Sequence, residues 1–109
     1  FGDSVRFGAS TAAEDEKDLS KVSCDLHLFE VYAKGFIEGC GGALTDLEIE
    51  TLPLGAILMT FENGIRFLTD YLEIHREGHN LDRCRTQLTL VKDMQEKLPQ
   101  MNEIIKKYQ

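Results

Sequence analysis

The sequence lacks the excess of basic residues that nucleic-acid-binding proteins use. Lysines and arginines number 12 against 19 aspartates and glutamates, so the net charge is -7 at pH 7. Sequence-independent binding of DNA or RNA depends on neutralising phosphates with basic side chains. A large nucleic-acid surface is therefore excluded, and we expect no nucleic-acid partner.

Paired cysteines and long apolar runs are also missing. Cys24, Cys40 and Cys84 are far apart and none belongs to a C-x-x-C pair, so neither a zinc site nor a redox pair is predicted, and we interpret the three as reduced, buried thiols. No stretch approaches the roughly 18 consecutive apolar residues of a membrane span. The amino end does not have the layout of a signal peptide. We expect no membrane partner and a cytoplasmic location.

What the sequence does contain is helical periodicity. Hydrophobic residues make up 42% of the chain and charged residues 28%, as in ordinary globular domains. No segment alternates over strand length. We predict a mainly α fold with one domain over 1–109, in which an irregular segment (1–23) leads into a helical bundle (24–109). Apolar residues recur every three or four positions in four segments: 24–40, 54–72, 80–98 and 99–108.

Several residues predict where these four or five helices begin and end. Thr45 and Glu48 match a capping box, and Pro53 closes the short helix that follows. Asn80 is expected to cap the next-to-last helix, and Pro99 suits the first turn of the last one. Gly64 allows close approach of another element. The predicted core consists of large apolar side chains on the periodic faces: Phe29, Tyr32, Phe36, Leu58, Phe61, Ile65, Leu68, Leu88 and Val91.

Two polar stretches lie near the amino end. The string "FGDSVRFG" contains a Gly-Asp pair, which by itself favours a simple loop. In phosphotransferases, however, a loop carboxylate before such a Phe-Gly commonly holds magnesium, and here that carboxylate would precede Phe1. The acidic run "EDEKD", from Glu14 to Asp18, is near a predicted helix start, so we interpret it as structural.

The stretch "HREGHNLDRCR" concentrates polar side chains that include His75, Arg76, His79 and Arg83. The two histidines are four residues apart but have no clear third ligand nearby, which disfavours a metal site. Two interpretations stay open: a solvated polar loop, and a loop that binds an anion or sugar hydroxyls through its arginine, histidine and asparagine side chains.

Taken together, three strings resemble the carboxy-terminal part of the N-acetylhexosamine 1-kinases, within the aminoglycoside phosphotransferase and choline-kinase-like superfamily. They are "FGDSVRFGASTAAEDEKDLSKV", "HLFEVYAKGFIEG" and "IHREGHNLDRCRTQ", and the resemblance covers essentially the whole chain. It implies the helical carboxy-terminal lobe of a protein-kinase-like fold, in an enzyme that phosphorylates the anomeric hydroxyl of an N-acetylhexosamine. ATP and Mg²⁺ would be the cofactors.

The resemblance also implies roles for particular residues. The family loop reads Asp-Phe-Gly-Asp, so the metal ligand would immediately precede Phe1, with no ligand in this segment. Asp3 would then lie near the magnesium, and Arg6 would pair with a carboxylate or a phosphate. The catalytic aspartate and the nucleotide-binding lobe would lie upstream, so this segment alone is expected to be inactive. On the acceptor side, the expected sugar-binding residues are His75, Arg76, His79 and Arg83.

The sequence departs from the family pattern between Glu73 and Ile74, where relatives carry additional residues. Either this protein has a natural deletion at this point, or residues that the protein contains are missing from the sequence between Glu73 and Ile74. We favour the second explanation. Relatives have also been labelled mucin-desulfating sulfatases. Known sulfatases of the main class mature a cysteine in a Cys-x-Pro-x-Arg motif, and this segment gives a sulfatase function no support. The three cysteines have other residues at the proline position: Leu26, Gly42 and Thr86.

Two alternative functions remain open at this stage. One is another small-alcohol phosphotransferase, acting on choline, an aminoglycoside or homoserine. Cationic substrates need an acidic pocket, whereas "HREGHNLDR" is rich in donors, which favours a hydroxylated or anionic ligand. The other alternative is a free-standing helical interaction domain without catalysis.

Overall fold

The computed structural model describes residues 1–73 and 78–109, with side chains from Asn80 onward in the second range. Within these ranges the chain forms no strand, only an isolated bridge between Ser10 and Cys24. The prediction of a mainly α fold is therefore confirmed. The helices are α1 (Gly2–Gly8), the 3₁₀ helix η1 (Leu19–Lys21), α2 (Leu26–Gly39), α3 (Asp46–Glu50), α4 (Leu52–Glu73), α5 (Gly78–Glu96) and α6 (Leu98–Lys106).

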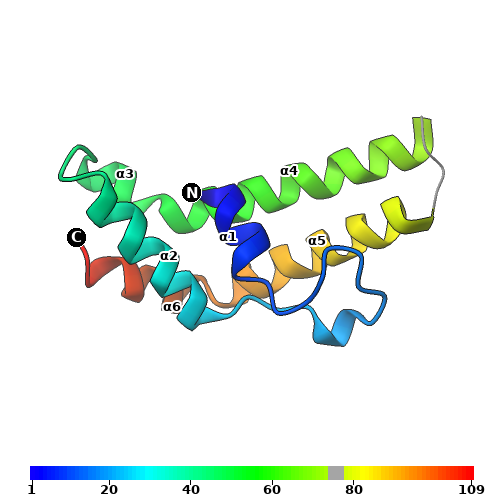
Figure 1. Ribbon diagram of the computed structural model, residues 1–109, viewed down its shortest axis with the longest axis horizontal. Helices are drawn as coiled ribbons and strands as arrows, with labels where there is room; N and C mark the ends of the chain where they lie inside the picture. The colour runs from blue at the N-terminus through cyan, green and yellow to red at the C-terminus, as the bar shows by residue number, and fades with distance from the viewer. Residues whose placement is uncertain (74–77) are drawn as a thin grey trace.

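The two longest helices, α4 and α5, run side by side, and α1 packs across α4 (Figure 1). Near the start of α4 and the end of α5, the helices α2, α3 and α6 gather around the carboxyl terminus. The molecule is elongated, with extents of 44 × 25 × 19 Å. No helix within the described ranges combines the length and the apolar character needed to cross a membrane. The largest fully buried side chains include Val5, Phe29, Leu90, Met94, Met101 and Ile105.

Several helix ends form as the sequence predicts. The Thr45 side chain accepts from the Glu48 amide, and the Glu48 carboxylate accepts from the Thr45 amide, so the capping box is complete. Pro99 lies in the first turn of α6. The cap of α2 is Asp25, whose carboxylate accepts hydrogen bonds from the backbone amides of His27 and Leu28. These local bonds satisfy backbone donors that a helix start leaves unpaired.

Three local predictions were wrong. The amino-terminal segment is not irregular throughout, because Gly2–Gly8 form α1, whose Val5 is fully buried. Pro53 does not close the short helix: it lies in the first turn of α4, where a missing amide hydrogen costs nothing. Asn80 is not a helix cap, because it is the third residue of α5 and is buried.

The predicted core was only partly right. Phe29 and Val91 are buried and Phe36 and Leu68 are half-buried, but the other five predicted core side chains are exposed: Tyr32, Leu58, Phe61, Ile65 and Leu88. On α4 the buried face combines the large residues Ile57 and Phe67 with smaller or polar residues such as Ala56, Thr60 and Asn63. The Thr60 hydroxyl donates to the Ala56 carbonyl, and the side-chain Nδ2 of Asn63 donates to the Met59 carbonyl. Because the helix itself satisfies these groups, they can be buried at low cost.

Gly64 permits the close packing of α4 on α5, in agreement with the sequence. A Cβ atom at Gly64 would lie 3.3 Å from both the Cβ of Gln87 and the Cδ2 of Leu88. The hairpin therefore positions Gln87, which also takes part in the site described below.

A buried cysteine fixes the segment before α2 to the end of α5. The Cys24 amide donates to Asp93 Oδ2 at 2.6 Å, and Lys97 Nζ donates to the Cys24 carbonyl at 2.7 Å. Burial raises the pKa of the Cys24 thiol to about 11, an effect that nearby Lys97 opposes and Asp93 reinforces. The thiol therefore stays protonated at neutral pH.

We predict that this thiol makes the fold less stable in alkali. The unfolded thiol ionises near pH 9 while the folded one keeps its proton to about pH 11. Stability is therefore lost as pH rises between these values, by about 2 kcal/mol at pH 10.5. Urea unfolding at pH 8 and pH 10.5 measures this loss. The Cys24→Ala variant should lose less unfolding free energy between these pH values than the wild type. Equal losses in the two proteins would contradict the assignment.

Candidate functional site

One cavity in the described surface gathers charged side chains that are largely buried. It has a volume of about 240 Å³ and is lined mainly by α1, the loop after it and α5, with Arg6, Ser10, Glu14 and Gln87 as its polar residues. A larger cavity of about 440 Å³ between α1 and α2 is mostly apolar, with Phe1, Val31 and Phe36 in its wall. The smaller cavity is therefore the better candidate for a polar ligand.

Arg6 is the centre of this site. It comes from α1 and its side chain is only 10% exposed. Its Nε donates to Asp3 Oδ1 at 2.9 Å, one helical turn earlier, and its Nη1 donates to Glu14 Oε2 at 2.5 Å. Nη1 also lies 3.3 Å from Gln87 Oε1 on α5. The guanidinium group thus connects α1, the following loop and α5.

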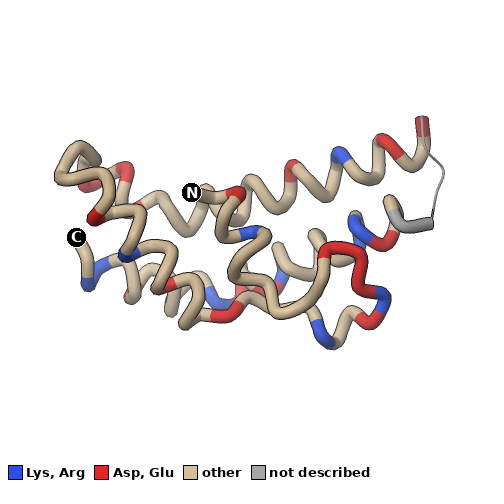
Figure 2. The backbone as a smooth tube through the Cα atoms, viewed as in Figure 1, with Lys and Arg blue, Asp and Glu red and all other residues tan. Residues whose placement is uncertain are grey.

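Glu14 reaches Arg6 because the loop that carries it is closed at its base. The Thr11 amide donates to the Ser23 carbonyl and the Asp25 amide to the Ala9 carbonyl, which holds the two loop ends together. At the tip, the Thr86 hydroxyl donates to the Glu14 carbonyl, which ties the loop to α5. In Figure 2 the acidic part of this loop lies against the first turns of α5, where basic residues occur.

Arg83 approaches the same carboxylate from α5. Its Nε is 3.6 Å from Glu14 Oε1, which is an ionic contact but too long for a hydrogen bond. This buried Nε has no hydrogen-bond partner among the described residues. The guanidinium carbon lies 5.9 Å from the centre of the Phe67 ring, a position consistent with cation–π attraction. Arg83 therefore has donor capacity that its neighbours do not use.

We call Asp3, Arg6, Glu14 and Arg83 the Arg6–Glu14 cluster. Burial by itself would lower the pKa of Arg6, but hydrogen bonds to Glu14 and then to Asp3 outweigh it, so the pKa is raised and the group stays charged. Two carboxylates face two guanidinium groups, which leaves the cluster without net charge. An uncharged polar ligand suits such a cluster better than a free phosphate, for which arginine charge would have to be available.

The structure brings together three residues that the sequence singles out. Arg6 and Arg83 meet at Glu14 while Asp3 contacts Arg6, and the expected pairing of Arg6 with a carboxylate is present. His75 and Arg76 lie outside the described residues, as does the side chain of His79. The junction after Glu73, with its predicted omission, lies outside them too.

Sequence reasoning did not identify three residues of the site: Glu14, Thr86 and Gln87. Glu14 belongs to the acidic run that we assigned to a helix start. That assignment holds for Asp18, whose carboxylate caps η1, but Glu14 pairs with arginines instead. A buried arginine requires a carboxylate partner. Once Arg6 is taken to be buried, a nearby acidic residue such as Glu14 is the expected partner. No local pattern indicated Thr86 or Gln87.

Metal chemistry has no complete ligand set in this part of the chain. No group of three or more histidine, cysteine, aspartate or glutamate side chains among the described residues could hold a metal ion. No known protein-family model matches the chain.

Proposed function

We propose that the chain is the helical carboxy-terminal lobe of an ATP- and Mg²⁺-dependent kinase that phosphorylates the anomeric hydroxyl of an N-acetylhexosamine. The observation that carries this proposal is the meeting of Arg6 and Arg83 at Glu14. Arg6 belongs to the first string of the family resemblance and Arg83 to the third. Two residues 77 positions apart in sequence, one from each string, thus lie in one site, as a shared role would require.

The absence of net charge on the Arg6–Glu14 cluster supports a sugar as the ligand beside it. An N-acetylhexosamine is uncharged, so its recognition depends on directional hydrogen bonds to hydroxyls and the acetamide. Among the described residues the buried Nε of Arg83 has no hydrogen-bond partner, and the residues proposed to act with Arg83 are His75, Arg76 and His79. Arg6 and Glu14 would hold the loop and Arg83 in place without contacting the sugar.

The described residues do not by themselves fit a magnesium site. In the proposed enzyme the metal ligand immediately precedes Phe1, and the magnesium would neutralise charge on the ATP phosphates when bound. Asp3 would lie near it but is already engaged by Arg6. The catalytic base and the nucleotide-binding lobe would also come from upstream, so the segment alone is expected to be inactive.

The test compares two neighbouring arginines in the full-length enzyme. Arg83→Ala should lower kcat/KM for the sugar by about 5- to 150-fold, the range of one lost hydrogen bond to a buried group, and leave the KM for ATP nearly unchanged. Arg85→Ala is the control, because Arg85 is 57% exposed and its ion pair with Asp82, at 3.9 Å, lies outside the Arg6–Glu14 cluster. A coupled assay with N-acetylglucosamine and N-acetylgalactosamine gives both constants.

The result separates the acceptor site from a structural role. If Arg83→Ala weakens sugar and ATP equally, or changes only the melting temperature, Arg83 does not bind the acceptor. If the wild-type enzyme transfers no phosphate to either sugar, the kinase proposal itself fails.

A further inference from the structure

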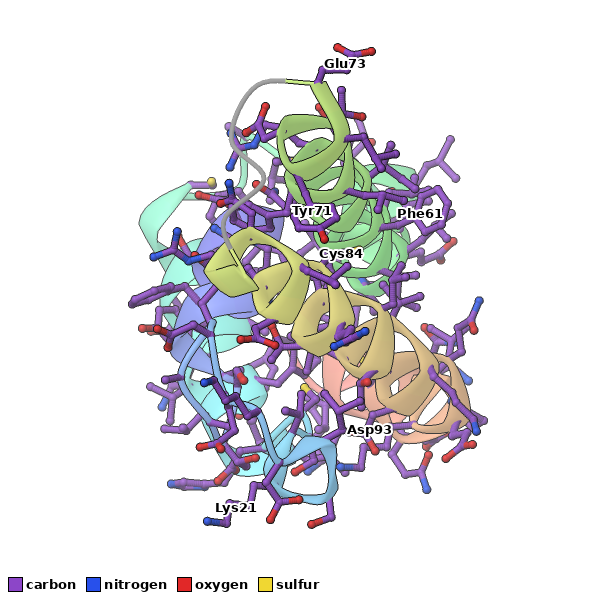
Figure 3. All side chains as sticks on the ribbon, turned by 90° about the vertical axis from the view of Figure 1, so that its right-hand side faces the viewer. Lys21, Phe61, Tyr71, Glu73, Cys84 and Asp93 are labelled. Atoms are coloured by element: carbon purple, nitrogen blue, oxygen red, sulfur yellow. The ribbon has the colours of Figure 1, made fainter. Side chains whose placement is uncertain are left out.

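An exposed apolar surface runs along α4. Five large side chains on one face of the helix are 43% to 56% exposed: Leu54, Leu58, Phe61, Ile65 and Leu72. Leu88 of α5, 39% exposed, adjoins them beside Gly64. We call these six residues the α4 stripe. Figure 3 shows Phe61 projecting from α4 on the side away from α1.

The stripe is large for the surface of a monomer. Six side chains of this size, each about half exposed, present on the order of 500 Å² of apolar area, which is at the upper end for a monomeric protein. A stable interface buries about 800 Å² per partner. Further side chains along the same helix can supply much of the remaining interface area: the half-buried Leu68 and the flanking Glu62, Arg66 and Thr69.

The spacing of the stripe identifies its partner. With Leu68 included, the apolar positions on α4 are separated by 4, 3, 4, 3 and 4 residues, which is the heptad pattern of a helix–helix seam. The pattern is also symmetric about residue 63. An antiparallel copy with its two-fold axis at the level of Asn63 would place Leu54 opposite Leu72 of the partner subunit, Leu58 opposite the partner's Leu68 and Phe61 opposite the partner's Ile65.

The charges beside the stripe are compatible with this arrangement. Glu62 and Arg66 are both exposed and lie one turn apart on the same side of the seam. Around the two-fold axis, each Glu62 would lie between its own Arg66 and Arg66 of the partner subunit. The four groups together have no net charge. We infer that the chain forms an antiparallel homodimer through the α4 stripe, a property independent of the proposed kinase function.

Sedimentation of the 109-residue chain between about 1 and 200 µM tests this inference, because a dissociating dimer changes mass over such a range. Leu58→Asp should weaken association at least about 30-fold and retain the helical circular dichroism. Leu47→Asp is the matched control: Leu47 is 69% exposed on α3, a helix that contributes no residue to the stripe, and its replacement should leave the dimer intact. If the wild-type chain is monomeric at every concentration, the inference is wrong, and the stripe would then be a surface for a different protein. A dimer that Leu58→Asp does not weaken would also overturn the inference.

Charge exchange and cross-linking test the orientation. Glu62→Arg should weaken the dimer, and adding Arg66→Glu should restore it, because the second change returns the four groups to zero net charge. In a Cys40→Ser background, a mixture of the Leu54→Cys and Leu72→Cys variants should form a mixed disulfide under mild oxidation. Cross-linking of either variant with itself would indicate a parallel pair and overturn the antiparallel arrangement.

Discussion

Replacing Glu14 with alanine should lower the free energy of unfolding by about 3 kcal/mol, because it leaves the buried Arg6 without its closest partner. Arg6 is 10% exposed and Glu14 is 22% exposed, so water can replace the lost carboxylate only in part. Asp3 still contacts Arg6 but is 63% exposed, which limits its compensation. The expected loss is therefore at the lower end of the range for a broken buried ion pair.

Urea denaturation measures this loss, with Asp15→Ala as the control. Asp15 is the exposed neighbour of Glu14 in the same acidic run, and its replacement should change stability by less than about 0.5 kcal/mol. The double variant Arg6→Met, Glu14→Leu should recover much of the loss, because it removes both charges together. If Glu14→Ala and Asp15→Ala have equally small effects, the Arg6–Glu14 pair does not organise this site.

Local structure could be predicted from the sequence where a few neighbouring residues decide it. The Thr45–Glu48 box and the proline of α6 act within a single turn, so their outcome does not depend on the rest of the fold. Pro53 shows the limit of this reasoning, because proline is equally compatible with the end of one helix and the first turn of the next. Here Thr51 separates α3 from α4 and Pro53 falls after the break.

The buried face of α4 could not be predicted in the same way. This helix carries two candidate faces, one with large apolar residues such as Leu58 and Phe61, the other with Ala56, Thr60 and Gly64. Hydrophobicity alone selects the first. The structure buries the second face, together with Ile57 and Phe67, because its small residues allow close packing on α5. The large residues of the first face remain at the surface.

Only some residues of the candidate site were singled out from the sequence, and the contacts between them could not be predicted. Asp3 and Arg6 were singled out by the family resemblance and Arg83 by a polar string, yet nothing in sequence spacing relates residue 6 to residue 83. Their meeting depends on the loop closure between Ala9 and Asp25 and on the Thr86 contact to Glu14. These are long-range contacts, which a pattern within one segment does not contain.

Truncation of Phe29 to alanine should lower the free energy of unfolding by about 3–5 kcal/mol, the range for a fully buried phenylalanine. Phe29 is fully buried on α2, and its ring meets the Phe1 ring edge to face with centroids 6.0 Å apart. Removing the ring leaves a cavity among α2 and its neighbours that the packed core cannot refill. Thermal unfolding should show the loss at every protein concentration.

Phe61→Ala is the informative comparison, because the sequence predicts both phenylalanines to be core residues. Phe61 is 48% exposed, so its truncation should cost well under half as much as that of Phe29 when the chain is monomeric at low concentration. At high concentration the cost should increase, since the ring is proposed to lie in the dimer seam and association stabilises the fold by mass action. Equal losses for the two variants at low concentration would mean that the large apolar face of α4, and not the small one, is buried within the chain.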